Sequence, residues 1–133
     1  MKTVIDGKEW ILSILLADRP PISGSIFIDK RTSVTKEDIV INSLTMTGQT
    51  MQNGAFNVNC YVPNLSVNAE GVIVQVPNRA RLKTISSHVA RVLKSVSKNQ
   101  EYNLSVEKIE QFEEEVEKAN YINFRLNLNA FNN

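Results

Sequence analysis

The chain has 133 residues, a length typical of one domain with a substantial core, and we expect a single domain over residues 1–133. Hydrophobic residues make up 42% of the sequence and charged residues 22%, which excludes the composition of a disordered protein. A net charge of only +1 excludes overall basicity as an argument for nucleic-acid binding.

The single cysteine and the N-terminal segment indicate a protein made in a reducing compartment. Cys60 has no partner for an internal disulfide, and one thiol supplies too few ligands for a structural zinc site. Asp6, Lys8 and Glu9 interrupt the apolar run from Thr3 to Leu16. We therefore expect neither a signal peptide nor a membrane-spanning helix.

The first predicted element is a helix from about Asp6 to Ala17. Its apolar residues recur at helical spacing: Ile5, Ile11, Leu12, Leu15 and Leu16. Asp6 occupies the expected N-cap position, and Glu9 follows three residues later as in a capping box. Pro20 and Pro21 end the helix, because proline disfavours helical geometry in the preceding residue and donates no backbone hydrogen bond.

Three strands are predicted next. Ser25–Asp29 and Asp38–Asn42 are rich in strand-favouring residues, and the polar segment from Lys30 to Glu37 connects them at the surface. The clearest strand is Ala55 to Val62, in which two residue sets alternate. One set is apolar and places Cys60 in the core: Phe56, Val58, Cys60 and Val62. The other set forms a polar outer face: Asn57, Asn59 and Tyr61.

Two segments lack a strong period and are predicted to be long loops or arms. They run from Ser43 to Gly54 and from Asn64 to Gly71, ahead of the apolar segment Val72–Val76. Long loops on a small domain often contact partners, although these side chains could instead fold back onto the core. The candidate assembly contacts in and beside these segments are Met46, Met51, Gln52, Leu65 and Val67.

Pro77 and Asn78 introduce a second, amphipathic helix. Its apolar stripe has spacings of three and four: Leu82, Ile85, Val89, Val92 and Val96. The opposite face is predicted to carry a basic cluster without any acid: Arg79, Arg81, Lys83, Arg91, Lys94 and Lys98. These six residues are candidates for contact with a neighbouring subunit or with DNA.

Two C-terminal strands complete the prediction. Alternation begins at Tyr102, Leu104 and Val106 and returns in the last segment at Ile122, Phe124, Leu126 and Leu128. Between them, an acidic hairpin end supplies three more candidate assembly contacts: Glu113, Glu114 and Glu115. The predicted fold is α+β: a small antiparallel sheet flanked on one face by an N-terminal helix and a central amphipathic helix, with a C-terminal strand pair.

Catalytic patterns are weak throughout the sequence. His88 is the only histidine, and general-base catalysis needs an oriented partner. Cys60 alternates with core residues, unlike an exposed nucleophilic thiol. The five glycines are too far apart for a phosphate-binding loop, and no metal-ligand spacing occurs. We expect no enzymatic activity, no cofactor and no bound metal.

Several ordered segments resemble the tail-terminator, tail-completion and head-tail neck (connector) proteins of long-tailed bacteriophages. They are Leu15–Arg19, Gly24–Ile28, Asp38–Asn42, Gln52–Pro63 and Asn78–Leu82. The resemblance implies a non-enzymatic virion subunit that forms a ring, often hexameric, around the DNA channel. It also implies assembly in the bacterial host cytoplasm with other neck or tail proteins, and no family active site.

Two uses of the charged segments follow from that resemblance. The basic helix of one copy could pair with the acidic hairpin end of the next, or it could line the channel and contact packaged DNA without reading sequence. Two other functions remain open from sequence: a small nucleic-acid-binding protein that uses the helix from Asn78 to Lys98, and an enzyme whose site forms between subunits.

Overall fold

The computed structural model describes residues 3–44, 53–95 and 102–130. These residues form an α+β fold, as predicted. In chain order the elements are α1 (Val4–Ala17), β1 (Ile26–Ile28), β2 (Asp38–Ser43), β3 (Asn53–Pro63), β4 (Leu65–Ala69), β5 (Val72–Val76), α2 (Arg79–Ser95), β6 (Tyr102–Glu114) and β7 (Ala119–Ala130).

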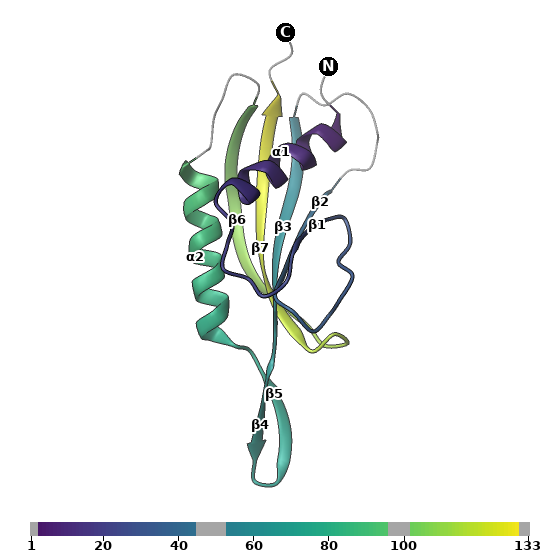
Figure 1. Cartoon of the computed structure of the whole chain (residues 1–133), viewed down its shortest axis with the longest axis vertical. Coiled ribbons are helices and arrows are strands. Elements are labelled where there is room, and N and C mark those ends of the chain that lie inside the picture. Colours follow the sequence, from purple (N-terminus) through teal and green to yellow (C-terminus); the bar gives the residue numbers. More distant parts are fainter. Residues whose placement is uncertain (1–2, 45–52, 96–101, 131–133) are drawn as a thin grey trace.

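Five of the strands form one sheet in the order β1-β2-β3-β7-β6, and both helices pack on the same face of it (Figure 1). All neighbouring strands are antiparallel except the edge pair β1 and β2, which is parallel. The sheet is therefore antiparallel, as predicted, except at this edge. In a parallel pair the chain must return from the end of β1 to the level at which β1 began. Because β1 has only three residues, the short segment 29–37 is long enough for this return.

Helix α1 begins earlier than the sequence pattern predicted. Its N-cap is Thr3, whose Oγ1 accepts a hydrogen bond from the Asp6 backbone N–H at 3.2 Å, while the Asp6 carboxylate accepts from the Thr3 N–H at 2.8 Å. The assignment of Asp6 as N-cap with Glu9 as its capping-box partner was therefore wrong. Asp6 is the third helical residue of a box that lies three residues earlier.

Gly24 lies where the chain approaches β2 closely, and this predicts an effect of substitution. Its N–H donates to the Glu37 carbonyl oxygen at 2.8 Å, and a Cβ at this position would lie 1.8 Å from Asp38 Oδ1. Because the Asp38 carboxylate is buried and accepts from the Ser25 N–H, it has little room to move. We expect Gly24→Ala to lower the free energy of unfolding by about 1–3 kcal/mol in urea titrations. An unchanged urea midpoint would show that this contact relaxes freely.

Strands β4 and β5 form a separate two-stranded hairpin, residues 65–76, that projects from the sheet (Figure 1). We call it the arm. The segment from Asn64 to Gly71 was predicted to be a long loop or arm, and it supplies β4 and the turn of this arm, whose strand pairing was not predicted. Glu70 and Gly71 both have positive φ, 53° and 85°, as a two-residue type I′ hairpin turn requires.

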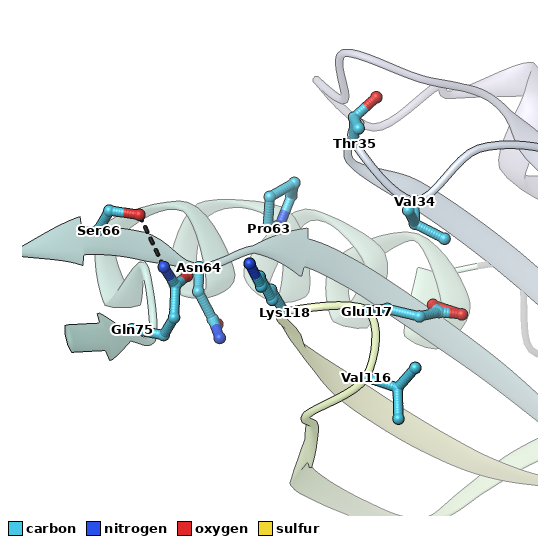
Figure 2. Close-up of a pocket in the computed structure, with 9 residues that line it drawn as sticks. All are labelled: Val34, Thr35, Pro63, Asn64, Ser66, Gln75, Val116, Glu117 and Lys118. Carbon is cyan, nitrogen blue, oxygen red and sulfur yellow. Dashed lines mark hydrogen bonds between the residues drawn. The ribbon is translucent and has the colours of Figure 1, made fainter. Parts of the chain in front are cut away.

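The root of the arm is held to the body by two hydrogen bonds near the β6–β7 turn. The Asn64 backbone N–H donates to the Lys118 carbonyl oxygen at 2.9 Å, and Asn120 Nδ2 donates to Asn64 Oδ1 at 2.7 Å. Pro63, Asn64 and Lys118 converge at this point (Figure 2). The arm is therefore anchored where it leaves the sheet.

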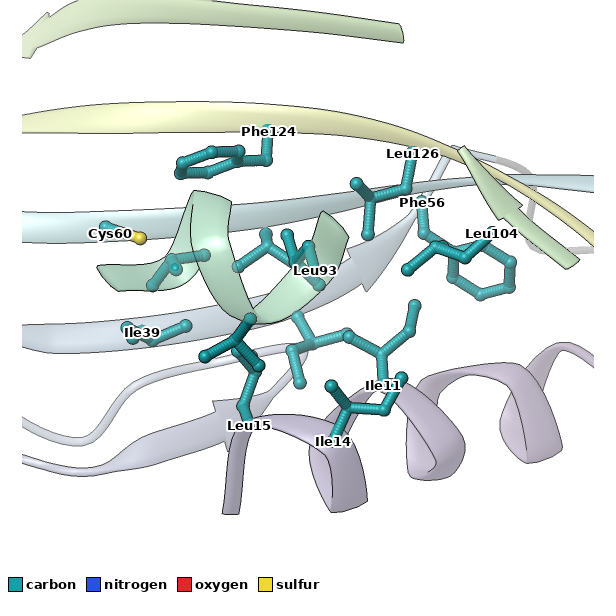
Figure 3. Packing of buried hydrophobic residues seen from close by; sticks show 14 of the residues in the cluster. Ile11, Ile14, Leu15, Ile39, Phe56, Cys60, Leu93, Leu104, Phe124 and Leu126 are labelled. Atoms are coloured by element: carbon teal, nitrogen blue, oxygen red, sulfur yellow. The ribbon is translucent and has the colours of Figure 1, made fainter. Parts of the chain in front are cut away.

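The core lies between the sheet and the two helices (Figure 3). Phe56 and Phe124 project from the sheet toward α1 and α2, together with Cys60, which is buried as predicted. Four of the five predicted stripe positions on α2 are buried: Leu82, Ile85, Val89 and Val92. The fifth, Val96, lies outside the described residues. The periodicity of the sequence thus identified the side chains that hold α2 to the sheet.

Candidate assembly surfaces

The arm has one aliphatic face and one largely polar face. Because directly paired residues of an antiparallel ladder share a face, the register of β4 and β5 separates the two sets. The aliphatic set is Leu65, Val67, Ala69, Val72, Val74 and Val76. The other set is Ser66, Asn68, Ile73 and Gln75, in which Gln75 Nε2 donates to Ser66 Oγ at 2.7 Å.

The body of the protein leaves this aliphatic face largely uncovered. The side chains of Leu65, Val67, Val72 and Val74 are 46%, 42%, 63% and 40% exposed. Their contiguity matters, since single exposed aliphatic residues are common whereas contiguous apolar surface usually marks a contact site. An isolated two-stranded hairpin is also only marginally stable in water. The aliphatic face therefore has the properties of a protein contact surface.

A pocket of about 420 Å³ lies at the root of the arm, on the side of its polar face (Figure 2). It is bounded by the arm, by the β6–β7 turn and by the connection between β1 and β2. Of its lining residues, Glu117 and Lys118 are the ionisable ones, and neither lies beside a cysteine or histidine in that lining. The hydroxyls of Ser66 and Thr35 in this lining hydrogen-bond to Gln75 and Ser33, and not to Glu117 or Lys118.

The predicted basic cluster is on α2, but two of its members are held by acids of the same chain. Arg81 makes a bidentate pair with Glu37, with Nε to Oε2 at 2.7 Å and Nη2 to Oε1 at 2.9 Å. Arg91 Nη1 lies 3.1 Å from Asp18 Oδ2. Three other members of the cluster are exposed and form no ion pair with the described residues: Arg79, Lys83 and Lys94. Lys98 lies outside the described residues.

The Glu37–Arg81 pair predicts a pH dependence of stability. The hydrogen-bonded Arg81 guanidinium holds the pKa of Glu37 below its usual value, against the opposing effect of burial, and the Ser23 N–H also lowers it. A lowered folded-state pKa stabilises the protein above the unfolded-state pKa, and this contribution is lost as the pH falls through the folded-state value.

We expect Glu37→Gln to cost about 1 kcal/mol at pH 7, because the Arg81 side chain is more than one-third exposed, and to cost less at pH 3. Urea midpoints of both proteins at the two pH values measure this difference. An equal cost at both would show that the charge of Glu37 does not contribute.

The acidic candidates lie at the end of the β6–β7 hairpin. Glu113 and Glu115 are exposed, and Glu114 is half-buried beside Tyr121, whose pKa is raised by burial and by this carboxylate. In Figure 1 this hairpin end and α2 lie on different sides of the body. Within the described ranges, no ion pair joins α2 to Glu113, Glu114 or Glu115. The two charged regions are therefore separate surfaces.

The sheet face opposite the helices carries a network of asparagine amides. Asn57 Nδ2 donates to Asn42 Oδ1 at 2.9 Å, and Asn123 Nδ2 lies within hydrogen-bonding distance of Asn57 Oδ1 (3.0 Å) and Asn59 Oδ1 (2.6 Å). These contacts link β2, β3 and β7. The outward asparagines predicted on the long strand thus satisfy one another, which makes this face more rigid than its composition suggests.

Aromatic rings form a row at one end of the same face. Tyr61 and Tyr121 have ring centroids 4.8 Å apart, Phe112 lies 5.4 Å from Tyr121, and the guanidinium of Arg31 lies 4.1 Å over the Tyr61 ring. Arg31 also pairs with Glu117. Sequence reasoning found only Tyr61 of this row. Because Arg31 lies over the Tyr61 ring and Tyr121 packs between Tyr61 and Phe112, the two tyrosines offer little free surface for stacking bases.

The other catalytic candidates have structural environments. His88 Nε2 donates to the Asp18 carbonyl oxygen at 2.9 Å and links α2 to the end of α1. Burial raises the pKa of the Cys60 thiol, which disfavours the reactive thiolate. Across residues 3–44, 53–95 and 102–130, no group of three His, Cys, Asp or Glu side chains is placed to hold a metal ion.

No protein-family model matches the chain, and no curated protein matches it significantly. Among the described helices, none has both the length and the apolar composition needed to cross a membrane.

The predicted assembly contacts in the two long segments are partly on the arm. Leu65 and Val67 lie on its aliphatic face, whereas three lie outside the described residues: Met46, Met51 and Gln52. Sequence reasoning missed the other strand of that face: Val72, Val74 and Val76.

Proposed function

We propose that this protein is a non-enzymatic virion subunit that forms a closed ring in the neck or tail end of a long-tailed bacteriophage. The ring would join or close the tail around the DNA channel, together with other neck or tail proteins, after assembly in the host cytoplasm. The observation that carries the proposal is the aliphatic face of the arm, which the body leaves exposed.

The arrangement of the surfaces favours head-to-tail contact between copies. The arm projects from one end of the body, and the basic helix α2 and the acidic end of the β6–β7 hairpin lie on different sides of it (Figure 1). Two different surfaces that meet in successive copies make a heterologous contact, which yields a ring when the rotation closes. Complementary charge on α2 and on Glu113 and Glu115 would fix the orientation of neighbours.

The free energies of burial and association favour a ring in which each subunit makes several contacts. Covering four half-exposed aliphatic side chains contributes roughly 3–6 kcal/mol, because full burial of one contributes about 1.5–3 kcal/mol. Association costs about 4–15 kcal/mol in lost freedom of motion. The burial of one arm therefore barely offsets the cost of association. In a closed ring each subunit both gives and receives an arm, so breaking one subunit out requires the loss of two contacts.

The exposed bases Arg79, Lys83 and Lys94 suit a sequence-independent contact with packaged DNA in the channel. A dedicated nucleic-acid-binding function is a weaker proposal, because Arg81 and Arg91 are already paired within the chain. The affinity for duplex DNA, measured at 50 mM and 200 mM salt, distinguishes the ring proposal from the nucleic-acid-binding proposal. The ring proposal predicts weak binding that is lost at the higher salt, whereas tight binding by a monomer supports the alternative.

Imaging of the purified protein tests the ring directly. We expect negative-stain micrographs to show particles of one diameter with a central opening, and mass photometry to give one multiple of the 15.0 kDa chain. Open filaments would contradict closure of the ring. Particles of monomer mass at every concentration would contradict the proposal as a whole.

A further inference from the structure

Helix α1 is apolar on two sides, and only one of them faces the core. Its inner side buries Val4, Ile11, Ile14 and Leu15. On its outer side, Ile5 and Leu16 are 64% and 51% exposed, and Leu12 is half-buried. At about 100° per residue, these three positions fall within roughly 20° of one line along the helix. We call Ile5, Leu12 and Leu16 the outer stripe.

A helix that covers one face of a sheet normally presents polar side chains to solvent. Here the outer stripe places Ile5 and Leu16 there, with Leu12 between them partly buried against the core. Glu9 and Ser13 are exposed beside the stripe. The exposed fractions mean that the described part of the chain does not cover Ile5 or Leu16. The stripe is a second uncovered aliphatic surface, separate from the arm.

We propose that the outer stripe of α1 receives the aliphatic face of the arm from a neighbouring copy of this chain. The inference rests on the proposed ring and names the surface that each arm binds. In Figure 1 the arm occupies one end of the long axis and α1 lies toward the other. An arm therefore cannot reach the stripe of its own chain, but it can reach that of a second copy.

The two surfaces match in length and chemistry. From Ile5 to Leu16 the stripe spans eleven residue steps, or roughly 16 Å at 1.5 Å per step. Each five-residue strand of the arm is about 17 Å long. Neither surface carries a charged side chain within its aliphatic set, which disfavours nucleic acid or a lipid headgroup as the occupant.

The size of the contact explains why it needs the ring. Two paired strands are about 10 Å wide, so the arm covers on the order of 170 Å² of its partner. A stable interface buries about 800 Å² on each partner. The arm and stripe therefore specify which surfaces meet, while closure and the charged surfaces add the remaining stabilisation.

A pair of defective variants tests the contact. The arm variant is Val67→Asp with Val74→Lys, and the stripe variant is Ile5→Glu with Leu16→Lys. In the stripe variant, the acid falls in the first turn of α1 and the base in the last, which suits the helix dipole and preserves the helix. Circular dichroism and thermal melting check that both variants remain folded.

Head-to-tail docking makes a specific prediction for the mixture. Each variant alone should be monomeric, with assembly weakened at least 100-fold. An equimolar mixture should give a weak dimer at high protein concentration and nothing larger, because the intact arm of the stripe variant binds the intact stripe of the arm variant, whereas the other arm and the other stripe are defective. Analytical ultracentrifugation measures these masses.

Other outcomes overturn the inference in distinguishable ways. If the stripe variant forms rings like the wild type, α1 is not the receptor, although the proposed function stands. If both variants are folded monomers and the mixture contains no dimer even at protein concentrations far above those at which the wild type assembles, the arm and stripe do not bind each other. If the wild-type protein is itself a monomer, the proposed function fails and this inference fails with it.

Disulfide trapping gives an independent readout in the assembled protein. Val67→Cys combined with Leu16→Cys should cross-link neighbouring copies under mild oxidation, since native Cys60 is buried and does not compete. The matched control is Ser66→Cys combined with Leu16→Cys, because Ser66 is adjacent in sequence but lies on the polar face. Equal cross-linking by the two pairs would overturn the assignment of the aliphatic face.

Discussion

Replacing Val67 by aspartate and Val74 by lysine is expected to convert the assembled protein into a folded monomer. The two positions are directly paired across β4 and β5, so the new charges attract each other and the hairpin retains its register. Both charges would enter an aliphatic contact, where desolvation costs several kcal/mol. Size-exclusion chromatography with light scattering, at several protein concentrations, measures the loss of assembly.

A matched control places the same pair of charges on the other face of the arm. Ser66 and Gln75 are also directly paired, and Ser66→Asp with Gln75→Lys adds the same charges one residue away. We expect this variant to assemble within about twofold of the wild type, an effect below roughly 0.5 kcal/mol. If the control dissociates as completely as the Val67 and Val74 variant, the aliphatic face is not the contact surface.

Truncating the core residue Phe124 is expected to have the largest effect on folding. The ring of Phe124 is 1% exposed on β7, opposite Val58 of β3 and Ile109 of β6. Phe124→Ala removes this ring and leaves a cavity, at a cost of about 3–5 kcal/mol in the free energy of unfolding. For a chain of this size, the melting temperature should fall by roughly 10–20 °C. Urea titration and calorimetry measure both quantities.

Phe112 provides the comparison for the same side chain on the neighbouring strand. It is 41% exposed and packs against Tyr121 on the open face of the sheet. Phe112→Ala should therefore cost only about 1 kcal/mol. If the two alanine variants lose similar stability, the open face contributes more to folding than the burial of its side chains indicates. Phe124→Leu, with a smaller expected loss, keeps the comparison measurable if Phe124→Ala fails to fold.

Regular periodicity made most of the body predictable. Cys60 and Phe124 are buried because they lie on the apolar sides of alternating strands, and Ile85 and Val89 are buried because they lie on one stripe of α2. The N-cap of α1 was misplaced because Thr3 and Asp6 form the same motif three residues earlier. The parallel pairing of β1 and β2 depends on the path that segment 29–37 takes between the two strands, and the local sequence does not determine this path.

The strand pairing of the arm was missed although its pattern is present in the sequence. Aliphatic residues alternate on both sides of Glu70-Gly71, from Leu65 to Ala69 and from Val72 to Val76. The strongest hairpin turns contain Asn-Gly or Asp-Gly, and glutamate is not a usual residue at positive φ. Only the observed register shows that the aliphatic side chains of both strands share one face.

The candidate site was partly predictable for a similar reason. Arg79, Lys83, Arg91 and Lys94 are exposed, as predicted for the outer side of α2, whereas Arg81 is half-buried. The acids that hold Arg81 and Arg91 lie 44 and 73 positions away in the sequence. Only the fold brings Glu37 and Asp18 to α2. The outer stripe of α1 was also hidden, because a helix that is apolar on two sides gives no indication of which side remains exposed.

Backbone hydrogen exchange of the arm, measured by mass spectrometry over a range of protein concentrations, tests the central claim most directly. The amides of β4 and β5 belong to a two-stranded hairpin that has little stability of its own. If neighbouring copies cover the aliphatic face, exchange in residues 65–76 should be slow at concentrations where the protein assembles and fast after dilution, while β3 and β7 remain protected throughout. Equally fast exchange in the arm at every concentration would contradict the account.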